Sequence, residues 1–157
     1  MSKYEFLLSC CNELDPADYW DCQFAPALSF EEIDNLEARS GITVPEELKD
    51  FYQFSYGARL CEYKILTLDE IADTLKELIE VYGVYNRSSL LPFASVLGVG
   101  DYVALDLALA QDGELMVVDG FHELGPDEWE NICYGLVNWL TKLAKNKFQP
   151  FWLGNSE

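Results

Sequence analysis

Few residues in this sequence are of the types that build a catalytic centre. The single histidine, His122, lies in the segment 119–123 (Asp-Gly-Phe-His-Glu), where a nearby carboxylate could orient it as a general base. One histidine cannot complete a typical His-rich metal site, and the chain contains no G-x-S-x-G nucleophile elbow. We therefore interpret His122 as a solvated or hydrogen-bonded loop residue, and we expect a protein that is not an enzyme and holds no metal or cofactor.

A glycine-rich segment, 98–101 (Gly-Val-Gly-Asp), superficially resembles a phosphate-binding loop. It lies between two predicted strands, opens no helix and is not followed by a lysine, so it lacks the groups that hold a phosphate. A turn between strands, with Gly100 at positive φ or in close backbone contact, explains the pattern better. Four aspartates follow along the chain from this segment: Asp101, Asp106, Asp112 and Asp119. Their spacing does not match that of a calcium-binding loop.

The charge of the chain is strongly one-sided. The 157 residues include 28 acids and 10 Lys or Arg, a formal net charge of −18, with 50% hydrophobic residues. This charge repels phosphate backbones and anionic lipids, so we expect neither nucleic acid nor a membrane as partner. Residues 88–141 contain nine acids and no Lys or Arg. That stretch is interpreted either as a merely soluble surface or as a docking face for a basic protein. Aromatic anchors for such a face would be Tyr102, Phe121, Trp129 and Tyr134, of which Trp129 fits a core position equally well.

Helix signals dominate the first half of the chain. Capping boxes at 29–32 and 67–70 predict helices that start at Phe30 and Leu68, and Gly41 and Gly83 should end them. Between them, a helix should begin at Pro45 and stop at Gly57. The expected inward positions of these three helices are Phe30, Ile33, Leu36, Leu48, Phe51, Tyr52, Leu68, Ile71, Leu75, Leu78, Ile79 and Tyr82.

Strand signals follow. Short apolar or alternating runs predict strands at 60–66, 90–97, 102–109 and 114–119, the last two joined as a hairpin through Asp112-Gly113. The run 102–109 is nearly all apolar, which favours a central strand covered on both faces. Helical spacing from Trp129 to Ala144 predicts a final helix that begins near Pro126, and a short helix is expected at 4–14. The fold class is therefore α+β, with N-terminal helices, a mainly antiparallel sheet and a closing C-terminal helix.

The cysteines and the N-terminus bear on the compartment. Five cysteines include one adjacent pair and no C-x-x-C spacing, which argues against a disulfide framework or a zinc site, so we expect them to be reduced and mostly buried. The N-terminal residues carry an early acid and no long apolar stretch, unlike a secretory signal. We expect a cytoplasmic protein.

With these elements placed, residues 28–143 resemble the SUKH superfamily, which includes fungal cell-wall-synthesis regulators of the Smi/Knr type and many bacterial immunity proteins. The most specific motif comprises Ile33, Glu37, Gly41, Ile42 and Pro45, and it continues through Leu48, Phe51, Tyr52 and Gly57. Later segments at 68–71, 91–94, 100–106 and 136–140 also resemble the family. The chain departs from it at Tyr56, where an Asn is common, and Asp119 and His122 do not match the spacing of the family's Asp-His pair.

The resemblance implies one SUKH-like domain at 28–157, preceded by an N-terminal helical extension at 1–27 that packs on it. It also implies a protein that acts by binding, as an immunity protein that neutralises a basic, nuclease-like toxin; the alternative is a regulatory interaction module of the cell-wall-synthesis type. We expect a monomer or a small homo-oligomer. The predicted partner-binding residues are Asp101, Tyr102, Asp106, Asp119, Phe121, Glu123 and Glu128.

Overall fold

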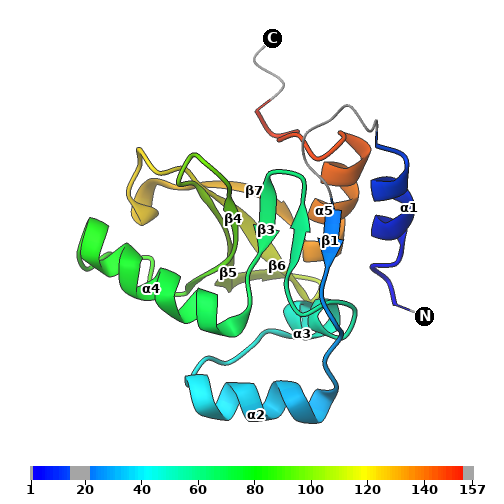
Figure 1. The fold of residues 1–157 in the computed structure, drawn as a ribbon. Coiled ribbons are helices and arrows are strands. Elements are labelled where there is room, and N and C mark those ends of the chain that lie inside the picture. The colour runs from blue at the N-terminus through cyan, green and yellow to red at the C-terminus, as the bar shows by residue number, and fades with distance from the viewer. Residues whose placement is uncertain (1, 15–21, 154–157) are drawn as a thin grey trace.

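The computed structural model describes residues 2–14 and 22–153, and these form five α-helices, a short 3-10 helix and one sheet of seven strands (Figure 1). Residues 15–21 of the expected N-terminal extension lie outside the described residues. In chain order the elements are α1 (Phe6–Asn12), β1 (Cys22–Phe24), α2 (Phe30–Ser40), α3 (Glu46–Tyr52), β2 (Ala58–Leu60), β3 (Tyr63–Ile65), α4 (Leu68–Tyr82), β4 (Leu90–Val96), β5 (Tyr102–Gln111), β6 (Glu114–Gly120), η1 (Pro126–Glu128), β7 (Glu130–Tyr134) and α5 (Leu136–Lys145).

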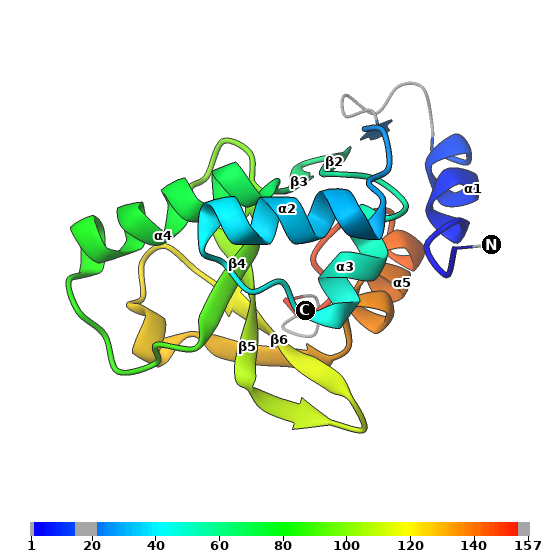
Figure 2. The same ribbon diagram turned by 90° about the horizontal axis from the view of Figure 1, so that it is seen from below.

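The sheet is a meander in which every strand pairs antiparallel with its neighbour in sequence, in the order β1 to β7. The α+β prediction is therefore confirmed. The β5–β6 hairpin turns at Asp112 and Gly113, both at positive φ, as the Asp-Gly pair indicates. Figure 2 shows the tip of this hairpin extending away from the helices.

Alternate residues of the central strands pack into two separate clusters. Val103, Leu105 and Val117 face the main core, together with residues of α1, α3 and α5. Ala104 and Val118 face the opposite side, where they pack with Leu78 of α4. Because side chains alternate across a strand, this arrangement covers both faces of β5 over its first half, as its apolar run predicts. Its second half, 107–111, is exposed.

The capping boxes are confirmed at both predicted sites. The Ser29 hydroxyl accepts from the backbone N–H of Glu32, and the Thr67 hydroxyl accepts from that of Glu70, so α2 and α4 begin where the sequence indicates. Two expected inward positions are wrong. Phe30 is 60% exposed and Ile79 is 54% exposed, because each lies on the side of its helix that no other element covers.

The predicted start of the final helix, near Pro126, is wrong. Pro126 opens only the 3-10 turn η1, Trp129 ends it, and residues 130–134 form β7, so α5 begins at Leu136. Trp129, Ile132 and Cys133 are spaced three and four residues apart, which is also the spacing of apolar residues on one side of a helix. The pairing of β7 with β6 decides that the segment is a strand. Gly135, at φ 95°, provides the break between strand and helix.

Two smaller boundaries also differ from expectation. The helix from Pro45 ends at Tyr52. Gly57 instead leads into β2, where its φ of +85° favours glycine and a Cβ atom would lie only 3.1 Å from the Ile65 carbonyl oxygen. The predicted strand 60–66 is a hairpin of two short strands, β2 and β3, that turns at Cys61.

The expectation that all five cysteines are reduced is also wrong, since Cys11 and Cys22 form a disulfide. The end of α1 and the start of β1 bring their Cα atoms to 5.9 Å, a separation that suits this bond. The packing of α1 against α5 and the pairing of β1 with β2 create this proximity, which the spacing of the cysteines does not reveal. Of the three cysteines outside this disulfide, Cys61 is buried, and Cys10 and Cys133 are half-buried.

Candidate functional site

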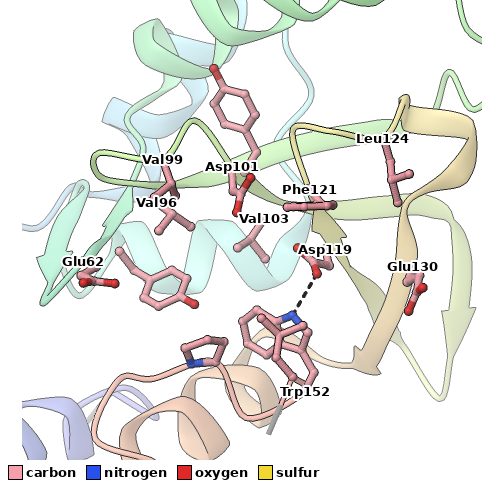
Figure 3. Close-up of a pocket in the computed structure, with 14 residues that line it drawn as sticks. Glu62, Val96, Val99, Asp101, Val103, Asp119, Phe121, Leu124, Glu130 and Trp152 are labelled. Carbon is pink, nitrogen blue, oxygen red and sulfur yellow. Dashed lines mark hydrogen bonds between the residues drawn. The ribbon is translucent and has the colours of Figure 1, made fainter. Parts of the chain in front are cut away.

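A cavity of about 420 Å³ opens at the end of the sheet where β4 passes into β5 and β6 ends (Figure 3). Its apolar wall includes Val96, Val99, Val103 and Leu124. Four carboxylates line it as well, those of Glu62, Asp101, Asp119 and Glu130, and none of its described lining residues is a Lys or Arg. The cavity thus combines apolar surface with negative charge of one sign.

The loop at 121–125 forms one rim of the cavity and is fixed by three hydrogen bonds from outside it. The Trp129 indole donates to the carbonyls of Phe121 and Leu124 at 3.1 and 2.9 Å. The Tyr82 hydroxyl donates to the His122 carbonyl at 2.7 Å. Since these donors come from a buried ring and a helix, they hold the rim in one position. Trp129 is therefore a core residue, 3% exposed, and not a contact of an exposed face.

The histidine is paired with Asp101 and not with Asp119, the nearest aspartate in sequence, and its Nε2 lies 3.9 Å from the adjacent Glu123 carboxylate. Asp101 Oδ1 accepts from the backbone N–H of His122 at 2.9 Å and lies 2.6 Å from its Nδ1. This contact joins the β4–β5 loop to the 121–125 loop across the mouth of the cavity. The glycine-rich segment that precedes Asp101 is a turn between strands with Gly100 at positive φ, as predicted, and Gly98 has a positive φ as well.

Asp119 is a partly buried carboxylate on the wall of the cavity. Its Oδ2 accepts from the Trp152 indole at 3.1 Å, a contact that Figure 3 shows across the cavity. Burial raises the pKa of the Asp119 carboxyl above its usual range, and the charges of Asp101 and Glu130 raise it further, while the hydrogen bond from Trp152 opposes them. None of the ion pairs found among the described residues includes Asp119, so no cation of that part of the chain compensates this charge.

Four of the seven predicted contact residues line the cavity together: Asp101, Tyr102, Asp119 and Phe121. The Tyr102 hydroxyl donates to Glu77 of α4 at 2.6 Å, and burial together with this hydrogen bond raises the pKa of Tyr102 to about 12. Phe121 is 36% exposed at the rim. Glu123 lies in the same loop with a side chain that is 69% exposed, and Glu128 is exposed in η1.

Asp106 lies apart from this group, toward the other end of β5. It is 3% exposed, and its Oδ2 accepts from Arg87 Nε at 3.0 Å while Oδ1 accepts from the Ser89 hydroxyl. Burial opposes ionisation, but hydrogen bonds from the Ala108 N–H, Arg87 and Ser89 outweigh it, so the pKa of Asp106 is lowered. A buried carboxylate that already has these partners does not belong to an exposed acidic face.

Among the polar and aromatic residues of the cavity, the sequence gives no indication of Glu62, Tyr63 or Trp152. Glu62 and Tyr63 come from the β2–β3 hairpin, and Trp152 comes from the segment after α5. No local motif marks them, because they join the site only through the order of the strands and the return of the chain past α5. Glu130 was visible as an acid in a cation-free stretch but carried no other signal.

No metal site is found within the described part of the chain, where no group of three or more His, Cys, Asp or Glu is arranged to hold an ion. No helix in residues 2–14 and 22–153 is both long and apolar enough to cross a bilayer.

The fold and the site define an α+β protein with a negatively charged cavity at one end of an antiparallel sheet. The sequence model of the SMI1 / KNR4 family (SUKH-1) matches residues 27–142 of the chain. Because this match spans most of its length, the chain belongs to that family, and the resemblance deduced from its motifs is confirmed. None of the curated proteins matches it. At the family level this membership supports a protein-binding role of the immunity or Smi1/Knr4 type.

Replacing Asp119 with Asn should stabilise the fold at neutral pH. A raised native pKa means that wild-type stability falls as the pH rises from about 3.9, the usual Asp value, through that native pKa. Asp119→Asn removes this loss and keeps an oxygen for the Trp152 indole. We expect a higher Tm than wild type at pH 7 and no difference near pH 4, measured by thermal unfolding followed by circular dichroism. The matched control is Asp73→Asn on an exposed position of α4; a pH-independent effect of Asp119→Asn would contradict the prediction.

Proposed function

We propose that this protein is an immunity protein that binds and neutralises a basic, nuclease-like toxin domain. The observation that carries the proposal is the acidic face around the cavity, defined here as Asp101, Tyr102, Asp119, Phe121, Glu123 and Glu128, together with Glu62 and Glu130. No cation compensates this face from within residues 88–141. Nucleases that grip phosphates present basic clefts, to which such a face is complementary.

The rigidity of the face supports a binding role. Its rim loop is held by Trp129 and Tyr82, and Asp101 ties the two loops together through His122. A preformed surface loses little conformational freedom on association, which favours tight binding. The aromatic rings of Phe121 and Tyr102 lie among the carboxylates, where a ring can provide apolar contact area at the centre of an interface. The charge itself would mainly accelerate encounter with a basic partner.

Charge reversal at the exposed part of the face tests the proposal. The double variant Glu123→Lys/Glu128→Lys should weaken binding of a partner isolated from the source lysate by at least about tenfold at low salt, because it replaces two attractive charges with repulsive ones. The difference should shrink above about 0.3 M salt, where the Debye length is about 6 Å. Titration calorimetry or biolayer interferometry at two salt concentrations measures both effects.

The matched control is Glu31→Lys/Asp34→Lys on α2, two exposed acids on a helix that lies at the other end of the molecule from the β4–β5 loop (Figure 1). The control makes the net charge less negative, as the double variant does, but it leaves the acidic face unchanged. It should therefore leave the affinity for the partner nearly unchanged. Recovery of a basic toxin domain that the wild-type protein inhibits would support the proposal. Recovery of kinases or cell-wall enzymes would favour the regulatory module instead, and equal effects of the control and the face variants would contradict docking through this face.

A further inference from the structure

The chemistry of the cavity indicates what enters it. Its apolar and aromatic walls suit a side chain with an apolar stem, and its four carboxylates suit a positively charged end. A volume of about 420 Å³ lies within the range of pockets that hold small ligands, and it is ample for one long side chain. Neutral or anionic groups would leave these carboxylates without compensation.

A second feature points to a ligand independently of the acids. Tyr63 lines the cavity and is only 2% exposed, yet its hydroxyl has no hydrogen-bond partner among the described residues. Burial, followed by the charges of Asp119, Glu62 and Asp101, raises the pKa of this hydroxyl, which places it in the field of three carboxylates of the cavity. The hydroxyl oxygen is not one of the fully buried, unpartnered polar atoms of the described residues, so it is open to the cavity and can accept from an incoming N–H donor.

We propose that the cavity is the receptor for one arginine side chain of the bound partner protein, with the guanidinium between the Tyr63 hydroxyl and the Asp119 carboxylate. This inference rests on the proposed function, since it names the group of the basic partner that anchors the complex. Arginine fits better than lysine because its planar guanidinium presents several N–H donors at once and stacks on aromatic rings. Trp152 and Phe121 provide those rings on two sides of the cavity, and Figure 3 shows both beside Asp119.

The test uses a small probe and needs no toxin. Nα-acetyl-arginine N-methylamide is titrated into isotope-labelled protein, and the resonances of the Trp152 indole N–H and the methyl groups of Val99 and Val103 are followed by NMR. We expect saturable shifts confined to the cavity and an affinity at least about tenfold higher than that of the citrulline derivative, which has the same shape without the charge. Tyr63→Phe and Asp119→Asn should each lower the affinity at least about fivefold, whereas Asp73→Asn on α4 should not change it.

Other outcomes overturn the inference. Equal binding of the arginine and citrulline derivatives, tighter binding of the lysine derivative, or shifts away from the cavity would each exclude a guanidinium receptor. The experiment also separates the inference from the proposed function. If the probe binds as expected but the isolated partner is insensitive to the Glu123 and Glu128 variants, the receptor stands and the acidic docking model fails. If a toxin binds through the face and tolerates both Tyr63→Phe and Asp119→Asn, the proposed function stands and the receptor is excluded.

Discussion

Arg87→Met should lower the free energy of unfolding by about 3–5 kcal/mol, because it removes the only charged partner found for a buried carboxylate in the described structure. Arg87 Nε donates to Asp106 at 3.0 Å, Nη1 donates to the Trp129 carbonyl at 2.7 Å, and Nη2 donates to Asn131 at 2.6 Å. One side chain thus joins the segment before β4 to β5 and β7. Urea denaturation followed by tryptophan fluorescence measures the loss.

The pH dependence identifies the cause of this loss. Because the native pKa of Asp106 is lowered, its stabilising contribution is present above the unfolded value of about 3.9 and is lost as the pH falls through the native pKa. The difference between wild type and Arg87→Met should therefore shrink below about pH 4. Adding Asp106→Asn to the variant should restore part of the stability at pH 7, since it removes the unpaired charge. The control Arg39→Met, at an exposed position of α2, should change stability by no more than about 0.5 kcal/mol. A loss that is independent of pH would contradict this explanation.

Glu47→Ala should lower the free energy of unfolding by about 3 kcal/mol, the second largest effect among the proposed substitutions. Its two carboxylate oxygens accept from the backbone N–H groups of Leu115 in β6 and Leu136 in α5, each at 2.8 Å. Leu136 is the first residue of α5, whose own N-cap residue, Gly135, has no side chain to accept this hydrogen bond. Glu47 therefore caps α5 from a different helix and places a negative charge at its positive end. Hydrogen bonds to charged groups contribute about 1.5–3 kcal/mol each and add incompletely.

Two comparisons make the Glu47 prediction specific. Glu46→Ala changes the neighbouring residue in the same first turn of α3, but its side chain is exposed, so the effect should stay within about 0.5 kcal/mol. Glu47→Gln retains one acceptor oxygen and should fall between the two. Hydrogen exchange provides a local readout, because the amides of Leu115 and Leu136 should lose protection in Glu47→Ala. If Glu46→Ala and Glu47→Ala are equally harmful, a general effect of charge in α3 explains both and the capping role is wrong.

The success and failure of sequence reasoning follow the range of the interactions involved. The capping boxes at Ser29 and Thr67, the Asp112-Gly113 turn and the covered first half of β5 depend on residues within a few positions of one another, so the sequence predicts them correctly. The final helix was placed too early because the apolar residues of β7 repeat at intervals that a helix would also show. Only pairing with β6 decides that this segment is a strand.

The same distinction holds for the candidate site. The sequence by itself determined the family, the α+β class and the excess of acids in residues 88–141, since these depend on residue types and their order. The tertiary structure decided which acids lie close together. Asp101, just before β5, lines the cavity, whereas Asp106, within β5, is paired with Arg87. Trp152 and the β2–β3 hairpin complete the cavity from distant parts of the chain. Such contacts arise from the packing of the sheet against α5, and no local pattern encodes them.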